Sequence, residues 1–159
     1  MLSTLALLAL AVPRAEAAPR VDRILVLKSA RKMLLLSAGR TVKSYRISLG
    51  RNPVGDKVRR GDGRTPEGKY IIKNRNSRSS FHRSLRISYP DPRDMMEARR
   101  RGVHPGGNIM IHGLPNGHGP SWAKKRLTDW TAGCIAVTDR EIREIWHLVA
   151  DGTPIEIRP

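Results

Sequence analysis

One cysteine and one histidine each lie beside a short apolar run near the centre of the chain. His112 follows the apolar residues 109–111, and Cys134, the only cysteine, precedes the apolar residues 135–137. A cysteine attacks as its thiolate, and a neighbouring imidazole can remove the thiol proton. The sequence therefore predicts a nucleophile–base pair in which Cys134 attacks and His112 is the base.

The preference for His112 as the base rests on its place in the chain. An imidazole at the end of an apolar strand is held rigidly, whereas His82 and His118 stand in polar loops that suit contact with solvent or substrate. Gly113 lets the chain turn directly after His112 and leaves its carbonyl free to accept a hydrogen bond from the imidazole.

The residues around Cys134 suggest how charge would be stabilised during such a reaction. Gly133 permits close approach of a substrate, and the amides of Gly133 and Cys134 would face a developing oxyanion. The competing interpretation of an isolated cysteine is a small buried hydrophobic residue.

Five histidines and a cysteine also raise the possibility of a zinc site. Cys134 with His104, His112 or His118 would supply the ligands, but no H-x-x-x-H or C-x-x-C spacing is present. We expect neither a metal nor an organic cofactor.

The composition indicates a basic protein of one domain. The chain has 159 residues, a net charge of +16 and only 4% aromatic residues, so the core must be mainly aliphatic. The charge favours nucleic acid, an anionic surface or a substrate with carboxylates. The basic residues are scattered without a nucleic-acid-binding motif, so we expect no nucleic acid partner. Candidate carboxylate-binding residues are Lys124, Lys125 and Arg126, although a solvated run of charges is the slightly favoured explanation for them.

The first residues resemble an export signal. Residues 2–12 are apolar but too few to span a bilayer, and residues 15–17 fit a small-x-small cleavage site, although no basic residue precedes the apolar run. We expect residues 1–17 to be cleaved and residues 18–159 to form the mature domain, in the periplasm or cell envelope and without stable membrane insertion. The alternatives are an uncleaved anchor or a disordered tail.

Short apolar and alternating runs predict a mainly β fold with few helices. The expected strands cover residues 23–28, 33–37, 41–49, 69–73, 84–89, 109–111, 135–137 and 153–157. Residues 94–101 form a short helix candidate capped by Asp91 or Asp94, with arginines 99–101 as a solvated face. Thr138 and Glu141 form a capping box that opens a helix reaching residue 150.

Residues 51–68 are polar and rich in glycine and proline, so they cannot form a regular element. A connection of this length is either functional or a flexible surface insertion.

The motifs IHG and TAGCIAV, preceded by LGRNPVG and GDGRTPEG, resemble the L,D-transpeptidase catalytic domain, or YkuD domain. The resemblance covers residues 21–159 and implies a β-sandwich of short strands with a few short helices. It implies that Cys134 is the acylated nucleophile, His112 its base, Gly113 the group that orients the imidazole, and Thr131 the residue of the Ser/Thr-x-Gly-Cys motif.

The implied reaction is acyl transfer on peptidoglycan stem peptides. A thioester forms at Cys134 with release of D-alanine, and an amine acceptor then takes the acyl group; the protein is expected to be a monomer. Ala132 and Ala136 replace residues that many members carry, and eighteen residues separate His112 from Thr131. The acceptor therefore stays open: hydrolysis by a carboxypeptidase or amidase is one alternative, and a non-catalytic peptidoglycan-binding module is another.

Overall fold

The computed structural model describes residues 20–125 and 127–159. The expected export signal, residues 1–17, lies outside the described residues. The strands are β1 (Arg23–Leu27), β2 (Lys32–Ser37), β3 (Arg40–Arg46), β4 (Gly68–Ser79), β5 (His82–Ile87), β6 (Met110–His112), β7 (Ile135–Ala136) and β8 (Pro154–Arg158). The helices are α1 (Pro92–Arg100), α2 (Trp122–Lys125) and α3 (Asp139–Leu148).

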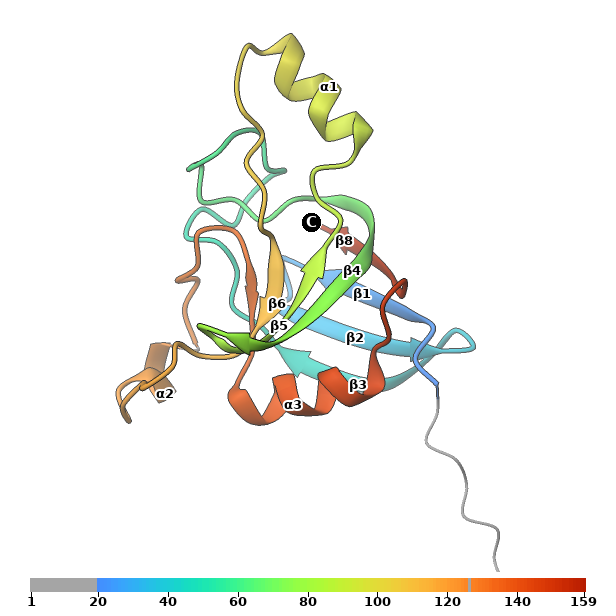
Figure 1. Cartoon of the computed structure of the whole chain (residues 1–159), viewed down its shortest axis with the longest axis vertical. Coiled ribbons are helices and arrows are strands. Elements are labelled where there is room, and N and C mark those ends of the chain that lie inside the picture. Colours follow the sequence, from blue (N-terminus) through green and yellow to red (C-terminus); the bar gives the residue numbers. More distant parts are fainter. Residues whose placement is uncertain (1–19, 126) are drawn as a thin grey trace, which may run out of the picture.

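The eight strands follow the order β3-β2-β1-β8-β4-β5-β6-β7 (Figure 1). The long strand β4 belongs to both halves of this order, because its first residues pair with β8 and its later residues pair with β5. The two outer ends of the order are joined by the segment after β3, where Ser48 and Ala136 exchange hydrogen bonds of 2.9 Å. The sheet therefore folds over and nearly closes on itself.

One aliphatic core fills the space between the two halves. Ile24 and Val26 from β1 meet Leu85 and Ile87 from β5 in a single cluster of buried side chains. This burial follows the alternation along each strand, which places every second side chain on the inner face. The predicted mainly β fold class is confirmed.

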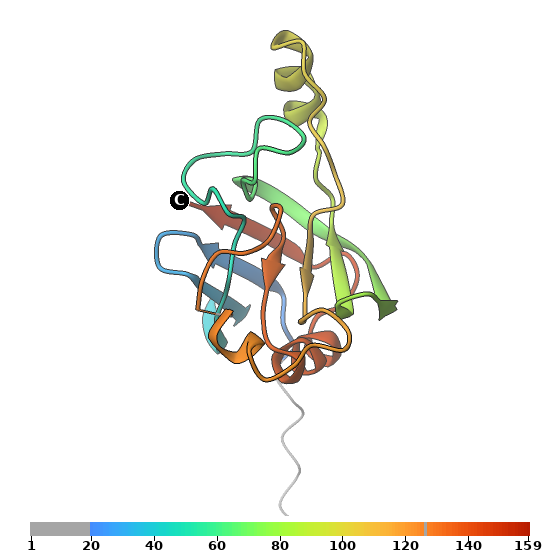
Figure 2. The ribbon, with the colours of Figure 1, turned by 90° about the vertical axis from the view of Figure 1, so that its left-hand side faces the viewer.

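Helix α3 covers one end of this core (Figure 2). Thr138 caps it with the predicted capping box to Glu141, and Ile142 and Ile145 are fully buried. Glu144 accepts a hydrogen bond of 2.9 Å from the Tyr45 hydroxyl of β3. The helix thus fixes the end of the sheet at which β6 finishes.

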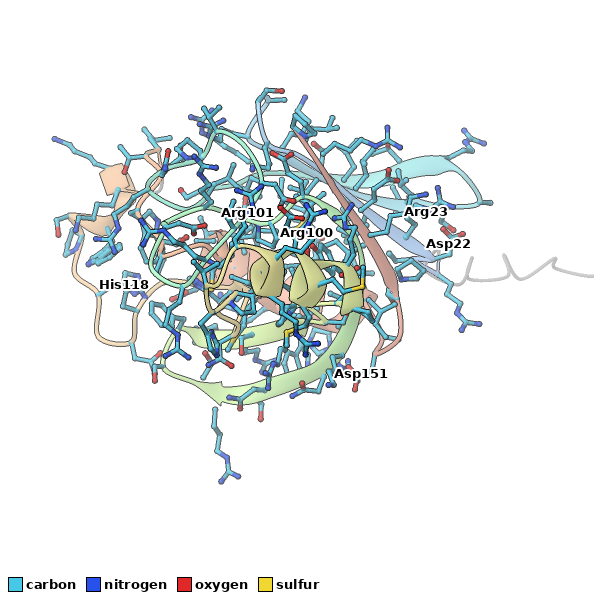
Figure 3. All side chains as sticks on the ribbon, turned by 90° about the horizontal axis from the view of Figure 1, so that it is seen from above. Asp22, Arg23, Arg100, Arg101, His118 and Asp151 are labelled. Atoms are coloured by element: carbon cyan, nitrogen blue, oxygen red, sulfur yellow. The ribbon has the colours of Figure 1, made fainter. Side chains whose placement is uncertain are left out.

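Helix α1 stands off from the sheet in both ribbon views (Figures 1 and 2). Asp91 caps it and forms a capping box with Asp94. Arg100 and Arg101 are exposed and both pair with Glu97 of the same helix, as expected of a solvated face (Figure 3). None of the helices in residues 20–125 and 127–159 is long and apolar enough to span a membrane.

The predicted end of β4 at residue 73 is wrong, because the strand continues to Ser79 and forms a ribbon with β5. Residues 74–78 are exposed, so no hydrophobic alternation marks them as a strand. The predicted end of β3 at residue 49 is also wrong. The strand ends at Arg46, and the chain then turns toward β7 through the bridge at Ser48.

Candidate active site

The parallel pairing of β6 and β7 brings the two reactive side chains to one face. Ile111 lies opposite Ile135 and His112 opposite Ala136. Ile111 and Ile135 point into the core, and side chains alternate along a strand, so His112 and Cys134 lie on the other face. Both line the same cavity of about 540 Å³.

The buried imidazole of His112 is fixed by the residue that follows it. Its Nδ1 lies 2.7 Å from the Gly113 carbonyl oxygen. A carbonyl only accepts, so Nδ1 carries the proton and Nε2 is the acceptor. Burial lowers the pKa of His112, and the hydrogen bond to Gly113 opposes this only in part. The imidazole is therefore neutral at pH 7 and can accept a proton at Nε2.

Glycine is the only residue type that fits at position 113. A Cβ there would lie 2.6 Å from Oδ1 of Asp139 and 3.1 Å from the Phe81 carbonyl oxygen. The chain thus packs tightly against the first turn of α3 directly after His112.

The thiol of Cys134 is protonated at rest. Burial raises its pKa, while a hydrogen bond from the Met110 backbone and the charge of Lys57 act in the opposite direction without cancelling the rise. The Sγ atom lies 3.4 Å from the Asn108 carbonyl oxygen, to which the thiol donates. Nucleophilic attack from this state requires a base to remove the proton.

Aromatic rings form the wall around His112. The ring centroid of Phe81 is 4.4 Å from that of His112, and the centroid of Trp130 is 5.7 Å away. Trp122 of α2 packs against Trp130 at 4.9 Å. These rings cover most of the imidazole, which is 4% exposed. These rings were not predicted from the sequence, although a tryptophan beside the TAGC motif in a chain with few aromatic residues is a usable signal.

Thr131 braces the turn that presents Cys134. Its Oγ1 donates to the Cys134 carbonyl at 2.8 Å and accepts from the Gly133 amide at 3.1 Å. Its backbone bonds to Leu49 and Arg51, which anchors the turn to the segment after β3. The Gly133 amide is thus occupied by Thr131 in this structure.

Gly133 is in a conformation and a place that only glycine accepts. Its φ is +138°, and a Cβ would lie 2.6 Å from the Arg64 carbonyl oxygen. A Cβ on Gly50 would lie 2.0 Å from the Gly63 carbonyl oxygen, and the Gly50 amide donates to Thr65 Oγ1 at 3.0 Å. The loop of residues 51–68 therefore packs directly behind the turn of residues 131–134, called here the nucleophile turn.

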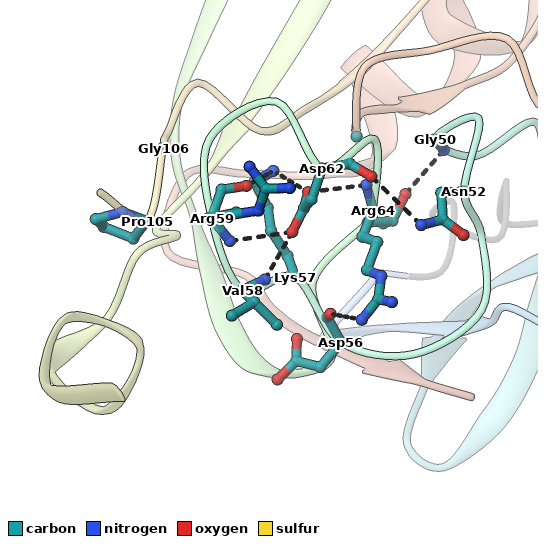
Figure 4. Close-up of polar contacts among 12 residues, drawn as sticks. Gly50, Asn52, Asp56, Lys57, Val58, Arg59, Asp62, Arg64, Pro105 and Gly106 are labelled. Carbon is teal, nitrogen blue, oxygen red and sulfur yellow. Dashed lines mark hydrogen bonds and ion pairs between the residues drawn. The ribbon is translucent and has the colours of Figure 1, made fainter. Parts of the chain in front are cut away.

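Asp62 organises one side of this loop (Figure 4). Its carboxylate pairs with Lys57 Nζ at 2.7 Å and accepts from the amides of Val58, Arg59 and Arg64 at 2.8–3.0 Å. Burial alone would raise the pKa of Asp62, but these hydrogen bonds outweigh it and lower the pKa to about 2. The loop is thus an ordered part of the site and not a flexible insertion.

Lys28, the residue directly after β1, holds the other side of the loop. Its buried Nζ donates to the Gly55 carbonyl at 2.7 Å, the Thr65 carbonyl at 2.9 Å and the Glu67 carboxylate at 2.8 Å. The sequence analysis missed Lys28, because a lysine at a strand end is usually exposed.

Other candidate residues lie elsewhere. His82 contacts Arg143 at 3.1 Å, and His118 contacts the Pro115 carbonyl at 3.1 Å in an outer loop (Figure 3). Neither histidine is among the described residues that line the cavity. The predicted substrate-binding residues Lys124 and Lys125 lie on α2, again outside that lining, and Arg126 lies outside the described residues.

Comparisons with known proteins agree with this architecture. The chain is similar over 88% of its length to the helical cell shape determining protein Pgp2 from Campylobacter jejuni, with 23% identity and a TM-score of 0.67, covering 48% of that chain. It is similar over 90% of its length to an L,D-transpeptidase from Xylanimonas cellulosilytica, with 15% identity and a TM-score of 0.56, covering 63% of that chain. The chain thus spans between about half and two-thirds of these structures. A search of curated proteins finds no match.

The match to a protein family covers nearly the whole described part of the chain. Residues 21–157 match the L,D-transpeptidase catalytic domain model, YkuD. That range contains β1 to β7, all but the last residue of β8, and the cavity with His112 and Cys134. The chain therefore belongs to the YkuD family of L,D-transpeptidase catalytic domains.

Proposed function

We propose that the protein is a cysteine acyltransferase that modifies peptidoglycan stem peptides, with Cys134 as nucleophile and His112 as general base. One observation carries the proposal: a neutral imidazole, fixed through Nδ1 to Gly113, lines the same cavity as the single thiol. Membership of the L,D-transpeptidase family supports the choice of substrate.

The first half of the reaction forms the thioester. His112 Nε2 takes the proton of the Cys134 thiol, and the thiolate attacks the carbonyl that joins the diamino acid to D-alanine. The amide of Cys134 is the proposed oxyanion donor, together with that of Gly133 once it is released from Thr131. The carbon–nitrogen bond then breaks, and the departing amine of D-alanine takes the proton from the imidazolium.

The second half transfers the acyl group. An amine acceptor gives a proton to His112 and attacks the thioester, the carbon–sulfur bond breaks, and the thiolate regains the proton. No metal or cofactor takes part. If water replaces the amine, the same steps make the protein a carboxypeptidase or amidase.

A covalent adduct tests the nucleophile. Incubation with a carbapenem is expected to add the mass of one inhibitor to the folded protein, with the modified peptide containing Cys134. Cys134→Ala is the matched control and should stay unmodified, because its side chain has no thiol. An unmodified wild-type protein whose activity on muropeptides equals that of Cys134→Ala would sink the proposal.

Product analysis separates the alternatives. Purified tetrapeptide muropeptides should yield cross-linked dimers if an amine is the acceptor and tripeptide monomers if water is. The non-catalytic alternative instead predicts binding to sacculi that is unchanged in Cys134→Ser and a thiol inert to alkylation in the native state.

We further propose that residues 1–17 are an export signal and that residues 18–159 act as a monomeric catalytic domain in the cell envelope. The peptidoglycan substrate supports this location. Mass spectrometry of protein recovered from the envelope should give a chain that begins at Ala18, and size-exclusion chromatography with light scattering should give a single chain. A retained amino terminus or a stable dimer would contradict these proposals.

A further inference from the structure

The described residues that line the cavity of His112 and Cys134 carry permanent charge of one sign only. Among the described residues that line it there is one permanently charged side chain, Arg78, and no aspartate or glutamate. The other described polar residues of the lining include the neutral Asn76 and Ser84. A cavity lined by a guanidinium and no carboxylate favours an anionic group over a cationic one.

The strand register places Arg78 on the wall that leads to the reactive pair. Asn76 of β4 lies opposite Ser84 of β5, and Ser84 lies opposite His112 of β6. Neighbouring strands are about 4.8 Å apart, so Asn76 is roughly 10 Å from His112, and Arg78 is two residues further along β4. A group bound by Arg78 is therefore several bonds away from a carbonyl at Cys134.

Two other arginines of the β4–β5 ribbon, Arg75 and Arg83, already have partners. Arg75 pairs with Asp151 at 3.1 Å, and its guanidinium lies 5.2 Å from the centre of the Trp146 ring. The guanidinium of Arg83 lies 5.3 Å from the same ring. Within the part of the chain that the structure describes, the Arg78 side chain is exposed and makes no ion pair or hydrogen bond, while its amide donates to Asn76 Oδ1 at 2.9 Å.

We infer that Arg78 binds a free carboxylate of the acyl donor and thereby selects stem peptides that carry that carboxylate. The inference rests on the proposed function of the same cavity. The shared chemistry is a carboxylate displaced by several bonds from the scissile carbonyl, either on the side chain of the diamino acid or on the terminal D-alanine. A guanidinium binds such a group through two parallel hydrogen bonds.

Matched donor peptides test the inference on the whole chain. Three tetrapeptide donors are compared: one with both carboxylates free, one amidated at the diamino acid, and one amidated at the terminal D-alanine. We expect wild type to prefer the free carboxylate over one of the two amides by roughly ten- to a hundredfold in kcat/KM. Arg78→Gln should lose that preference and retain its activity on the amidated donor. The donor that shows the effect identifies which carboxylate is bound.

Three further variants control for charge, place and hydrogen-bonding geometry. Arg46→Gln removes an exposed arginine of β3 that does not line the cavity, and this variant should keep the full preference. Arg86→Gln removes an arginine from β5 that lies opposite Met110 but does not line the cavity. Arg78→Lys keeps the charge without the paired hydrogen bonds and should retain only part of the preference.

The outcomes separate the inference from the function on which it rests. A wild-type protein that neither turns over any donor nor forms an adduct at Cys134 overturns both. Turnover without any preference, or a preference that survives in Arg78→Gln, overturns the role of Arg78 and leaves the acyltransferase proposal intact. Loss of the preference in Arg86→Gln alone would move the carboxylate site to β5.

Discussion

His112 and Cys134 are both buried enough to disfavour their charged forms. Burial lowers the pKa of the imidazole and raises that of the thiol. The resting pair is therefore a neutral imidazole and a thiol, not an ion pair. In the proposed reaction, the proton therefore moves from sulfur to nitrogen only when the substrate carbonyl reaches the thiol.

The first prediction concerns the pH dependence of activity. The base must be neutral to accept a proton, so activity should fall only as the pH drops through the lowered pKa of His112, below its ordinary 6.5. The acid limb of kcat/KM measured with a muropeptide donor locates this pKa in the free enzyme. An acid limb centred above pH 6.5 would contradict the proposed environment of His112.

The second prediction concerns stability at the same residue. The pKa of His112 is lower in the folded than in the unfolded protein, so the unfolded chain binds more protons as the pH falls below 6.5. The free energy of unfolding should therefore decline from pH 6.5 down to the folded pKa and lose nothing further from this group below it. Urea unfolding of wild type and His112→Gln at several pH values isolates the contribution, since only wild type should show it.

At the scale of elements, the loop of residues 51–68 acts as a backing for the nucleophile turn. Lys28 fixes it from the turn after β1, Asp62 fixes it from within, and the Arg64 carbonyl oxygen packs against Gly133. Glycine therefore has the same role in the loop and in the turn that contains Gly133, because it leaves space for the backbone of the other segment.

The third prediction tests that contact. Gly133→Ala adds a methyl group 2.6 Å from the Arg64 carbonyl oxygen, in addition to the strain of a positive φ. Gly61→Ala is a matched control, because Gly61 has a positive φ of +79° but no atom within 4 Å of the added methyl. We expect a loss of about 1 kcal/mol for Gly61→Ala and at least about 3 kcal/mol for Gly133→Ala in urea unfolding. Equal losses would show that the contact contributes nothing.

The fourth prediction tests the buried ammonium that holds the loop. Lys28→Met leaves two carbonyls and the Glu67 carboxylate without their shared donor, so we expect a loss of about 3 to 5 kcal/mol in the free energy of unfolding. Lys32→Met on β2 removes an exposed lysine and should change stability by less than about 0.5 kcal/mol. If Lys28→Met is as stable as Lys32→Met, the loop is held by other contacts.

At the scale of the whole molecule, the net charge bears on how the protein would meet the proposed peptidoglycan substrate. A net charge of +16 attracts a substrate that carries several carboxylates. The fifth prediction is that binding to isolated sacculi weakens as salt rises, because the screening length falls from roughly 30 Å at 0.01 M to roughly 3 Å at 1 M salt. Sacculi with amidated carboxylates are the control and should bind weakly at every salt concentration. Binding to native sacculi that is independent of salt would rule out this role for the charge.

Strands and helices were predictable from the sequence where the residue pattern follows from burial or from helix capping. Buried strands show as apolar runs, and the capping boxes at Asp91 and Thr138 mark both longer helices. The polar half of β4 and the end of β3 were not predictable. The exposed residue pairs on the β4–β5 ribbon show no hydrophobic alternation. The end of β3 depends on where the following segment turns to pair with β7, which is distant in the sequence.

By itself the sequence determined the reactive residue types, the family resemblance and the expectation that His112 and Cys134 belong together, because these depend on local residue identity and motif spacing. Only the tertiary structure decided the rest of the site. The rings of Phe81 and Trp130, the ammonium of Lys28 and the ribbon with Arg78 come from distant segments of the chain. They meet because β4, β5 and β6 pair side by side and the loop of residues 51–68 folds behind β7, and such long-range pairings leave no local pattern in a single sequence.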